Sequence, residues 1–429
     1  MTLSQEALKR RAKRRTAETR FRSYGIIALG IAGAMLLTLF FTVFTTGISA
    51  FWRHEALIEF QLTEKRMKID PTASYSDADY EKLARSAPYN LIVKDAMYAL
   101  FPDVKKRKHK KHLGKMISYG AEIALRNAVL KGKAHVGDNF KLWVPVSDDL
   151  DTFLKGYIDA SLPEKKRRVK DNEIEWVHKL QDNKLIRSSF DWGFFTRADS
   201  REPEMAGMGG AIKGSFYLLL VTFLLSVPIG VMAAIYLEEF ARQNKFTDFI
   251  EININNLAAV PSIIFGLLGL AMFLNFLGFP RSAPLVGGMV LSLMTLPTVI
   301  IASRNAIAAV PPTLREAAIG LGASPMQTVL HHVLPVALPG ILTGTILGLA
   351  RALGETAPLI MIGMVAFIAS VPDSIVDPSS ALPVQIFLWV DSPERAFVAK
   401  SNAAIMVMLG FLLVMNGTAA YLRHRAEER

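Results

Sequence analysis

The sequence predicts an α-helical polytopic membrane protein with about six transmembrane helices and a large extracytoplasmic insert between the first two. Hydrophobic residues make up 51% of the 429 positions, and the mean hydropathy is +0.29. The apolar residues are also gathered in long uncharged blocks, one before residue 50 and the others after residue 208. A helix of roughly 20 apolar residues crosses a bilayer core of about 30 Å, so each block is long enough to span.

The blocks give the spans in order. Residues 24–49 carry no charge and exceed the apolar core of a signal peptide, which predicts a retained transmembrane helix after a basic tail, residues 1–23. Within the second region, 209–422, five further blocks lie at 214–237, 257–279, 285–303, 336 to about 368, and 403–422. The fifth block is longer than one span needs, and Pro358 is expected to end or kink its helix.

The charge distribution orients these spans. The basic tail 1–23 and the C-terminal tail 423–429 are both expected in the cytoplasm by the positive-inside rule, and an even number of spans agrees. Residues 50–208 then form an extracytoplasmic domain. Its basic runs contribute to the net charge of +11, but long translocated loops are largely exempt from the rule. Nucleic-acid binding is the rival explanation of these runs, and the flanking membrane span disfavours it.

The extracytoplasmic domain is expected to be a mixed α/β or mainly α-helical globule. Residues 76–101, 115–130 and 172–186 have mostly helical apolar spacing, and 140–146 alternates like a strand. His109 and His112 have a spacing that suits a metal. They lie among Lys and Arg residues that repel cations, which favours a solvated face. No metal site and no cofactor are predicted.

A polar-bounded segment between two apolar blocks, 314–335, has the most informative spacing. It can form a short helix, a turn at Gly322 and a second helix, with Pro335 marking the start of the next span. The segment resembles the cytoplasmic coupling motif of ABC importer permeases, whose pattern is matched by Glu316, Ala317, Ala318, Gly322, Leu334 and Pro335. His332 departs from the pattern, where an aliphatic residue is usual. A helix-turn-helix without an ATPase partner is the structural alternative.

A narrower resemblance covers roughly the last half of the chain. The stretches 209–241, 256–270, 296–324 and 349–360 are similar to the phosphate-specific permease subunits of the PstA family. The run GETAP, from Gly354 to Pro358, is the most discriminating part. The resemblance implies an ABC importer permease fold for 209–422 and a role in ATP-driven import of inorganic phosphate. The long insert resembles an extended form of the subunit.

The resemblance also implies partners in a bacterial inner membrane. These are a second, PstC-like permease, a PstB-like ATP-binding dimer, and a PstS-like periplasmic phosphate-binding protein, together with membrane lipid. The chain contains no G-x-x-x-x-G-K-[ST] sequence, since its Gly-Lys pairs are followed by Met116 and Ala134. ATP hydrolysis is therefore expected on a separate subunit, and the chain is not expected to be an enzyme.

Three polar residues interrupt the fifth apolar block and are candidates for the substrate pathway: Arg351, Glu355 and Thr356. Ionisable groups inside a membrane usually face a bundle interior or a water-filled cavity. Arg351 and Glu355 are four residues apart, so on one helix they would share a face and pair. A guanidinium suits an oxyanion, and Glu355 could moderate its affinity. A buried ion pair that only orders helix packing is the alternative.

Three alternative functions are compatible with parts of the sequence. The substrate could be another oxyanion, such as phosphonate, sulfate or molybdate. A membrane-anchored sensor is disfavoured by the coupling motif and by the lack of a cytoplasmic output domain. A secondary transporter is disfavoured because neither half of the chain visibly repeats the other.

Overall fold

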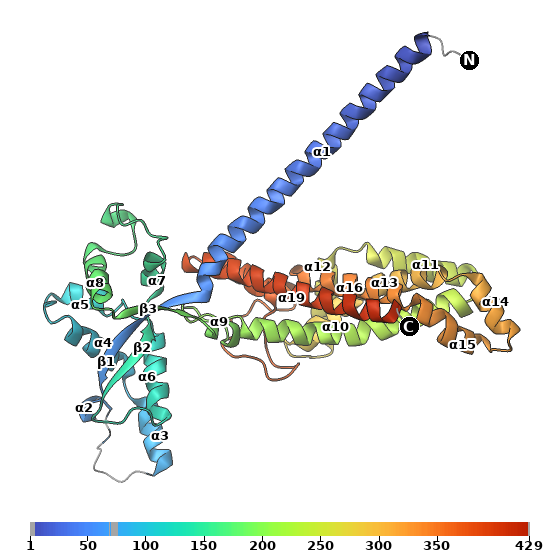
Figure 1. Ribbon diagram of the computed structural model, residues 1–429. Coiled ribbons are helices and arrows are strands. Elements are labelled where there is room, and N and C mark those ends of the chain that lie inside the picture. The colour runs from blue at the N-terminus through green and yellow to red at the C-terminus, as the bar shows by residue number, and fades with distance from the viewer. Residues whose placement is uncertain (1–4, 68, 70–75, 428–429) are drawn as a thin grey trace.

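The computed structural model describes residues 5–67, 69 and 76–427 and has three parts: a long first helix, a small α/β insert, and a helical bundle (Figure 1). The insert lies at one end of the bundle. The ends of the two predicted tails, residues 1–4 and 428–429, fall outside the described residues.

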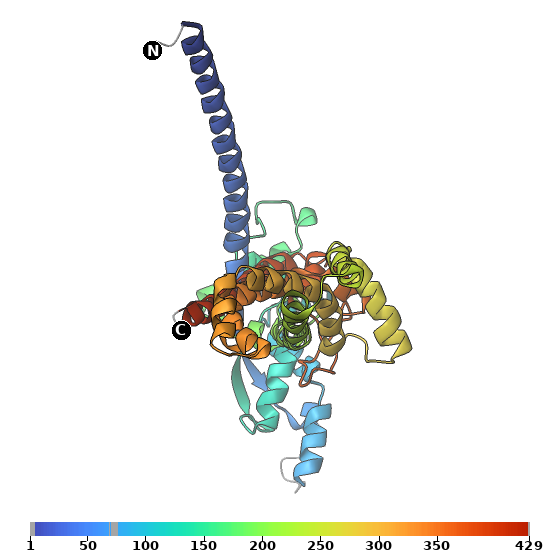
Figure 2. The same cartoon turned by 90° about the vertical axis from the view of Figure 1, so that its right-hand side faces the viewer.

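The first predicted span lies within α1 (Gln5–Gly47), which continues into the short η1 (Ile48–Phe51). α1 leans away from the bundle in both views (Figures 1 and 2) and meets α19 only near its end. Gly47 permits that contact, because a Cβ there would lie 2.8 Å from the backbone carbon of Asn402. The apolar length of α1 is exposed in the chain alone, as expected of a helix that faces lipid.

The insert is built on a three-stranded antiparallel sheet with the order β2-β1-β3. The strands are β1 (Trp52–Gln61), β2 (Asn139–Pro145) and β3 (Ile186–Phe190). Glu55 of β1 lies opposite Arg187 of β3, and its buried carboxylate accepts hydrogen bonds from Arg187 at 2.7 Å and Arg53 at 2.8 Å. Burial alone would raise the pKa of Glu55, but the two guanidiniums outweigh it and hold that pKa below its ordinary value.

Helices cover the sheet and complete the insert. They are α2 (Glu64–Met67), α3 (Asp77–Ser86), α4 (Tyr89–Leu100), α5 (Arg107–Leu113), α6 (Gly120–Leu130), α7 (Asp148–Leu154), η2 (Glu164–Lys166), α8 (Asp171–Asp182) and α9 (Gly193–Thr196). Phe60 of β1, Leu125 of α6 and Trp176 of α8 belong to one buried apolar cluster. The insert is therefore mixed α/β, one of the two expected alternatives. The sequence analysis missed β1 and β3, and the helix expected over 172–186 ends before β3 begins.

The bundle contains the remaining helices. They are α10 (Gly209–Ile235), η3 (Tyr236–Phe240), α11 (Lys245–Ala258), α12 (Ser262–Gly269), η4 (Leu270–Phe276), α13 (Pro284–Ala308), α14 (Pro312–Gly320), α15 (Pro325–Thr328), η5 (Val329–Val333), α16 (Leu334–Gly354), α17 (Ala357–Met361), α18 (Leu382–Val390) and α19 (Ala396–Glu427). Here η3, η4 and η5 are π-helical. α10, α13 and α16 pack together as its centre.

Five helices in the described part of the chain are long and apolar enough to cross a membrane, and a bent pair raises the number to six. The bent pair replaces the third expected span. α11 meets the helix formed by α12 and η4 at 98°, because Val260 and Pro261 separate them and Pro261 cannot donate the hydrogen bond that would continue the first helix. The apolar block 257–279 corresponds mainly to the second arm of this bent pair, α12 and η4, and the bend itself was not predicted.

Candidate functional site

The coupling segment forms a helical hairpin at the end of the bundle opposite the insert (Figure 1). α14 leads to a turn at Gly322, whose φ of +89° lies in the left-handed region that favours glycine. Ser324 then caps α15: its side chain accepts from the N–H of Gln327, and the Gln327 side chain accepts from the N–H of Ser324. The expected helix, turn and second helix are present.

The tip of this hairpin is apolar and exposed. Leu321 is 89% exposed, Ile319 57% and Met326 56%. Of the motif residues, Ala318 is buried, Leu334 is half-buried, and Glu316, Ala317, Gly322 and Pro335 are exposed; the divergent His332 is exposed too. Exposed apolar side chains rimmed by polar ones are typical of a surface that docks another protein.

Pro335 lies in the first turn of α16, but α16 is not separated from the helix before it. The helix that begins at Pro325 runs through η5 and α16 to Gly354 without a break large enough to divide it. The π-helical η5, Val329–Val333, lies directly before the proline and provides the local irregularity that a residue without an N–H requires. The second half of the coupling segment is therefore continuous with a membrane span.

Arg315 fastens the first half of the hairpin to the bundle. Its guanidinium donates to the carbonyl oxygen of Ile307 at 2.9 Å and to that of Val310 at 2.6 Å. It also pairs with Glu239 of η3, with Nη2 2.7 Å from Oε1. One side chain thus joins α14 to the end of α13 and to the helix that continues α10.

A second ion-pair cluster lies beside it. Arg304 of α13 reaches Glu251 of α11 at 2.8 Å and Glu238 of η3 at 3.3 Å. Sequence reasoning missed both Arg304 and Arg315. Two features of the sequence pointed to these ion pairs. Arg315 directly precedes Glu316, and the acidic pair Glu238 and Glu239 directly follows the apolar block 214–237.

The three predicted pathway residues lie where α16 ends. The helix stops at Gly354, and Glu355 is extended, with φ −81° and ψ 106°. Glu355 is the C-cap of α16, four residues after Arg351, and the helix ends at Gly354, four residues before Pro358, as expected if this proline interrupts it. Arg351 and Glu355 approach each other, with Nε of Arg351 3.6 Å from Oε1 of Glu355. Thr356 precedes α17, which Pro358 helps to begin.

Arg351 is accessible in the chain alone. Its side chain is 56% exposed, whereas that of Glu355 is 21% exposed. An ion pair exposed to this degree contributes at most about 1 kcal/mol to stability, so the pair has little weight in ordering the helices. The exposed part of the Arg351 guanidinium can face a neighbouring subunit or an aqueous path.

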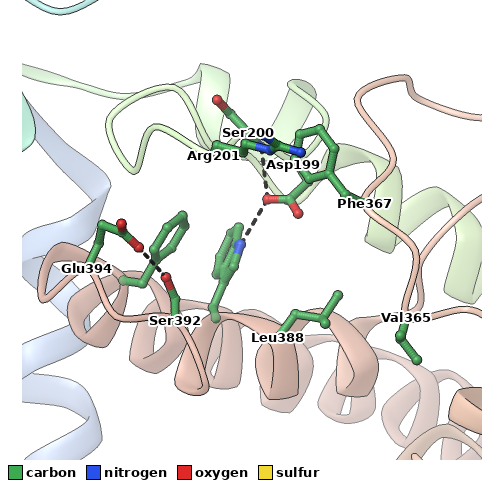
Figure 3. Close-up of a pocket in the computed structure, with 10 residues that line it drawn as sticks. Asp199, Ser200, Arg201, Val365, Phe367, Leu388, Ser392 and Glu394 are labelled. Carbon is green, nitrogen blue, oxygen red and sulfur yellow. Dashed lines mark hydrogen bonds between the residues drawn. The ribbon is translucent and has the colours of Figure 1, made fainter.

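A cavity of about 320 Å³ lies at the insert end of the bundle (Figure 3). Asp199 at its edge accepts hydrogen bonds from the indole N–H of Trp389 and the backbone N–H of Ser200, each at 2.9 Å. Arg201 lies over the ring of Phe367, 5.5 Å from its centre. The Asp199 carboxylate is hydrogen-bonded to Trp389 of α18. Arg201 contributes a positive charge to the cavity lining.

The histidine pair in the insert has structural contacts. His109 packs against Trp176, with ring centres 6.4 Å apart, and Nδ1 of His112 lies 3.2 Å from a carboxylate oxygen of Glu173. Across the described ranges, no group of three or more His, Cys, Asp or Glu residues could hold a metal ion.

A bundle of membrane-spanning helices carrying this coupling hairpin defines the permease class of ABC importers. Residues 226–428 match the family described as "Binding-protein-dependent transport system inner membrane component", and residues 8–164 match a domain of unknown function, DUF3333. The chain belongs to the binding-protein-dependent transport system inner membrane component family and is a permease component of an ABC importer.

Several curated relatives support this assignment. The probable ABC transporter permease protein YqgI of Bacillus subtilis is 32% identical over 55% of this chain and 84% of its own length. The phosphate transport system permease protein PstA 1 of Mycobacterium tuberculosis is 32% identical over 56% of this chain and 76% of its own length. PstA of Haemophilus influenzae is 32% identical over 54% and 81%. Among solved structures, the MetNI methionine ABC transporter is 18% identical, with a TM-score of 0.39 over 51% of this chain and 97% of the other.

The turn of the coupling hairpin offers a matched pair of glycine substitutions. A Cβ at Gly320 or at Gly322 would meet nothing within 4 Å, but only Gly322 has a positive φ. Gly322→Ala should cost about 1 kcal/mol through backbone strain, whereas Gly320→Ala should be neutral or stabilising in the last turn of α14. Hydrogen exchange over residues 312–333 should be about fivefold faster in Gly322→Ala alone. Equal exchange in the two variants would contradict the left-handed turn.

Proposed function

We propose that the chain is one of two permease subunits of an ATP-driven importer of inorganic phosphate. The observation that carries the proposal is its similarity, over 76% and 81% of their lengths, to two permeases named for phosphate transport. The guanidinium of Arg351, which is 56% exposed and lies 3.6 Å from a carboxylate oxygen of Glu355, is compatible with this substrate, because a guanidinium can donate two parallel hydrogen bonds to an oxyanion. Phosphonate, sulfate and molybdate are the alternative substrates of the same class.

The proposal includes separate partners for the other tasks. A PstC-like permease would complete the pathway, a PstB-like dimer would hydrolyse ATP, and a PstS-like binding protein would deliver phosphate. Two observations support this division. The chain has no phosphate-cradling G-x-x-x-x-G-K-[ST] loop, and the hairpin tip around Leu321 presents apolar side chains of the kind that dock into a groove on another protein.

Coupling then follows from how the hairpin is attached. Closure of the ATPase dimer would push on the hairpin as a rigid body. The push reaches α16 directly, because α15, η5 and α16 form one continuous helix. It reaches α13 and α10 through Arg315, which bonds Ile307 and Glu239. Arg351 lies at the far end of the same helix, α16, so motion at the hairpin and access at the pathway residues would be mechanically linked.

We further propose that the chain lies in a bacterial inner membrane with both termini and the hairpin in the cytoplasm. Residues 50–208 would then be extracytoplasmic. The placement of the insert and the hairpin at opposite ends of the bundle supports this orientation (Figure 1).

The first test is transport by the reconstituted complex. Labelled phosphate should accumulate in proteoliposomes only when ATP is present on the hairpin side and binding protein on the insert side. A tenfold excess of sulfate, molybdate or phosphonate should leave the rate unchanged. Faster uptake of one of these anions than of phosphate would make that anion the substrate. Uptake without ATP would overturn the importer mechanism.

The second test addresses the pathway. Arg351→Gln should lower phosphate uptake by about 30-fold or more, because loss of a hydrogen-bonded charge costs about 2 kcal/mol or more, while the complex still assembles and hydrolyses ATP. The charge swap Arg351→Glu with Glu355→Arg serves as the control. A swapped protein with full transport would rule out contact between Arg351 and substrate.

The third test addresses orientation. The chain has no cysteine, so single cysteines can be labelled without background. Lys108→Cys, at an exposed position of the insert, should react with a membrane-impermeant maleimide in intact cells. Leu321→Cys should react only after permeabilisation. The reverse pattern would invert the proposed topology.

A further inference from the structure

A second, larger cavity lies where the insert meets the first turns of α19. Its volume is about 740 Å³. Its walls come from the end of α1, from α7, from the segment 155–168, and from α19. Thr46 and Ala50 lie near the end of the first predicted span, so this cavity lies at the edge of the insert that faces the membrane. Neither the coupling hairpin nor Arg351 contributes to it.

Arg167 contributes a buried guanidinium to the cavity, with hydrogen-bond donors that lack partners within the described ranges. Its side chain is only 5% exposed, and it pairs with Asp171. Its Nε and Nη1 atoms are nevertheless buried without a hydrogen-bond partner among the described residues. Buried polar groups in folded proteins almost always have a hydrogen-bond partner, so these two nitrogens can donate to a group that enters the cavity. Both nitrogens are donors, so such a group must supply acceptors.

Other cations converge on the same space from two parts of the fold. Lys165 and Lys166 of η2 directly precede Arg167, and Arg395 directly precedes α19. The side chains of these three residues form no ion pair or hydrogen bond with the part of the chain that the structure describes. Their charge is thus available to a ligand.

The acidic residues of the cavity cancel only part of this charge. Two are paired with cations, Asp151 with Lys155 at 2.6 Å and Asp149 with Arg168 at 3.6 Å. Asp159 accepts from the backbone N–H of Ser161 at 2.8 Å, which holds its pKa below the ordinary value, so it stays negatively charged. Burial raises the pKa of Asp148, and it raises that of Glu204 to about 7. Near neutral pH Glu204 therefore carries only part of a negative charge.

We infer that this cavity is a binding site for a phosphate group, held by Arg167 together with Lys165, Lys166 and Arg395. A tetrahedral phosphate has several acceptor oxygens and can meet cations that approach from different elements, which a single carboxylate cannot. Apolar residues such as Ile158, Leu162 and Val398 line the rest of the cavity. The group could therefore belong either to free inorganic phosphate or to an anionic phospholipid. The inference does not depend on which substrate the pathway carries.

The test measures binding to the full chain in its purified complex, after exchange into lipid-free detergent. Two probes are titrated separately: inorganic phosphate and dihexanoyl phosphatidylglycerol. The measurements use the Arg351→Gln background, so that phosphate in the proposed pathway does not contribute. Saturable binding is expected for at least one probe, and Arg167→Gln should weaken it at least tenfold. Arg85→Gln, which removes the same charge from an exposed pair with Glu81, should change it less than twofold.

The two probes identify the source of the phosphate group. Binding of inorganic phosphate assigns the site to the free anion, and binding of the lipid alone assigns it to a headgroup. Absence of saturable binding for both probes, or binding that Arg167→Gln leaves unchanged, would overturn the inference.

The ligand-free melting temperature separates binding from packing. Arg167→Gln should melt at or above the parent protein, because it removes two unsatisfied buried donors. A lower melting temperature with unchanged binding would assign Arg167 to packing alone and overturn the inference.

Discussion

The buried carboxylate of Asp191 joins the two halves of the molecule. It is 2% exposed and meets Arg197 at 2.7 Å, Arg53 at 3.4 Å and Lys400 at 3.9 Å. These cations come from the segment before α10, from β1 and from α19. Lys400 also donates to the carbonyl oxygen of Ala206 at 2.7 Å. Removing one partner from such a buried cluster typically costs about 3–5 kcal/mol. The insert is therefore fixed to the bundle.

Close packing of α10, α13 and α16 makes the part of the bundle between the insert and the hairpin rigid. A Cβ at Gly288 of α13 would lie 2.5 Å from Val221 of α10, and one at Gly344 of α16 would lie 2.2 Å from Ala302 of α13. Small residues at such contacts let backbones approach closely, which is the main source of helix association in lipid. The central helices thus behave as one body, and Arg315 and the unbroken α15–α16 helix attach the hairpin to it. A displacement of the hairpin should therefore move α16 as a whole, including Arg351 at its other end.

Local patterns in the sequence predicted most of this architecture. The apolar blocks gave five spans, and the spacing from Glu316 to Pro335 gave the hairpin, because span length and turn chemistry are local properties. The bend in the third span was not predicted, because apolar content does not reveal an angle of 98° between two helices. The strand β1 was missed because it follows a long span directly, and its buried positions become evident only when β2 and β3 pair with it.

The ion pairs of the site could not be predicted in the same way. Arg315 and Glu239 are 76 residues apart, and Arg304 and Glu238 are 66 apart. No helical or strand period links residues at such separations, so only the folded chain brings them together. The Arg351–Glu355 pair was predicted from helical spacing, and the structure confirms it at the last residue to which that spacing applies. Glu355 is the C-cap of α16, and the backbone becomes extended there.

The central claim is that the exposed hairpin is the docking point of a separate ATPase. Leu321→Cys, carrying a photoactivatable maleimide, tests it in native membranes, because this side chain is 89% exposed at the hairpin tip. After illumination, the account predicts an adduct between this chain and a protein with a G-x-x-x-x-G-K-[ST] sequence, mapped by mass spectrometry. Adducts to lipid alone, or to a protein without a nucleotide-binding loop, would contradict it.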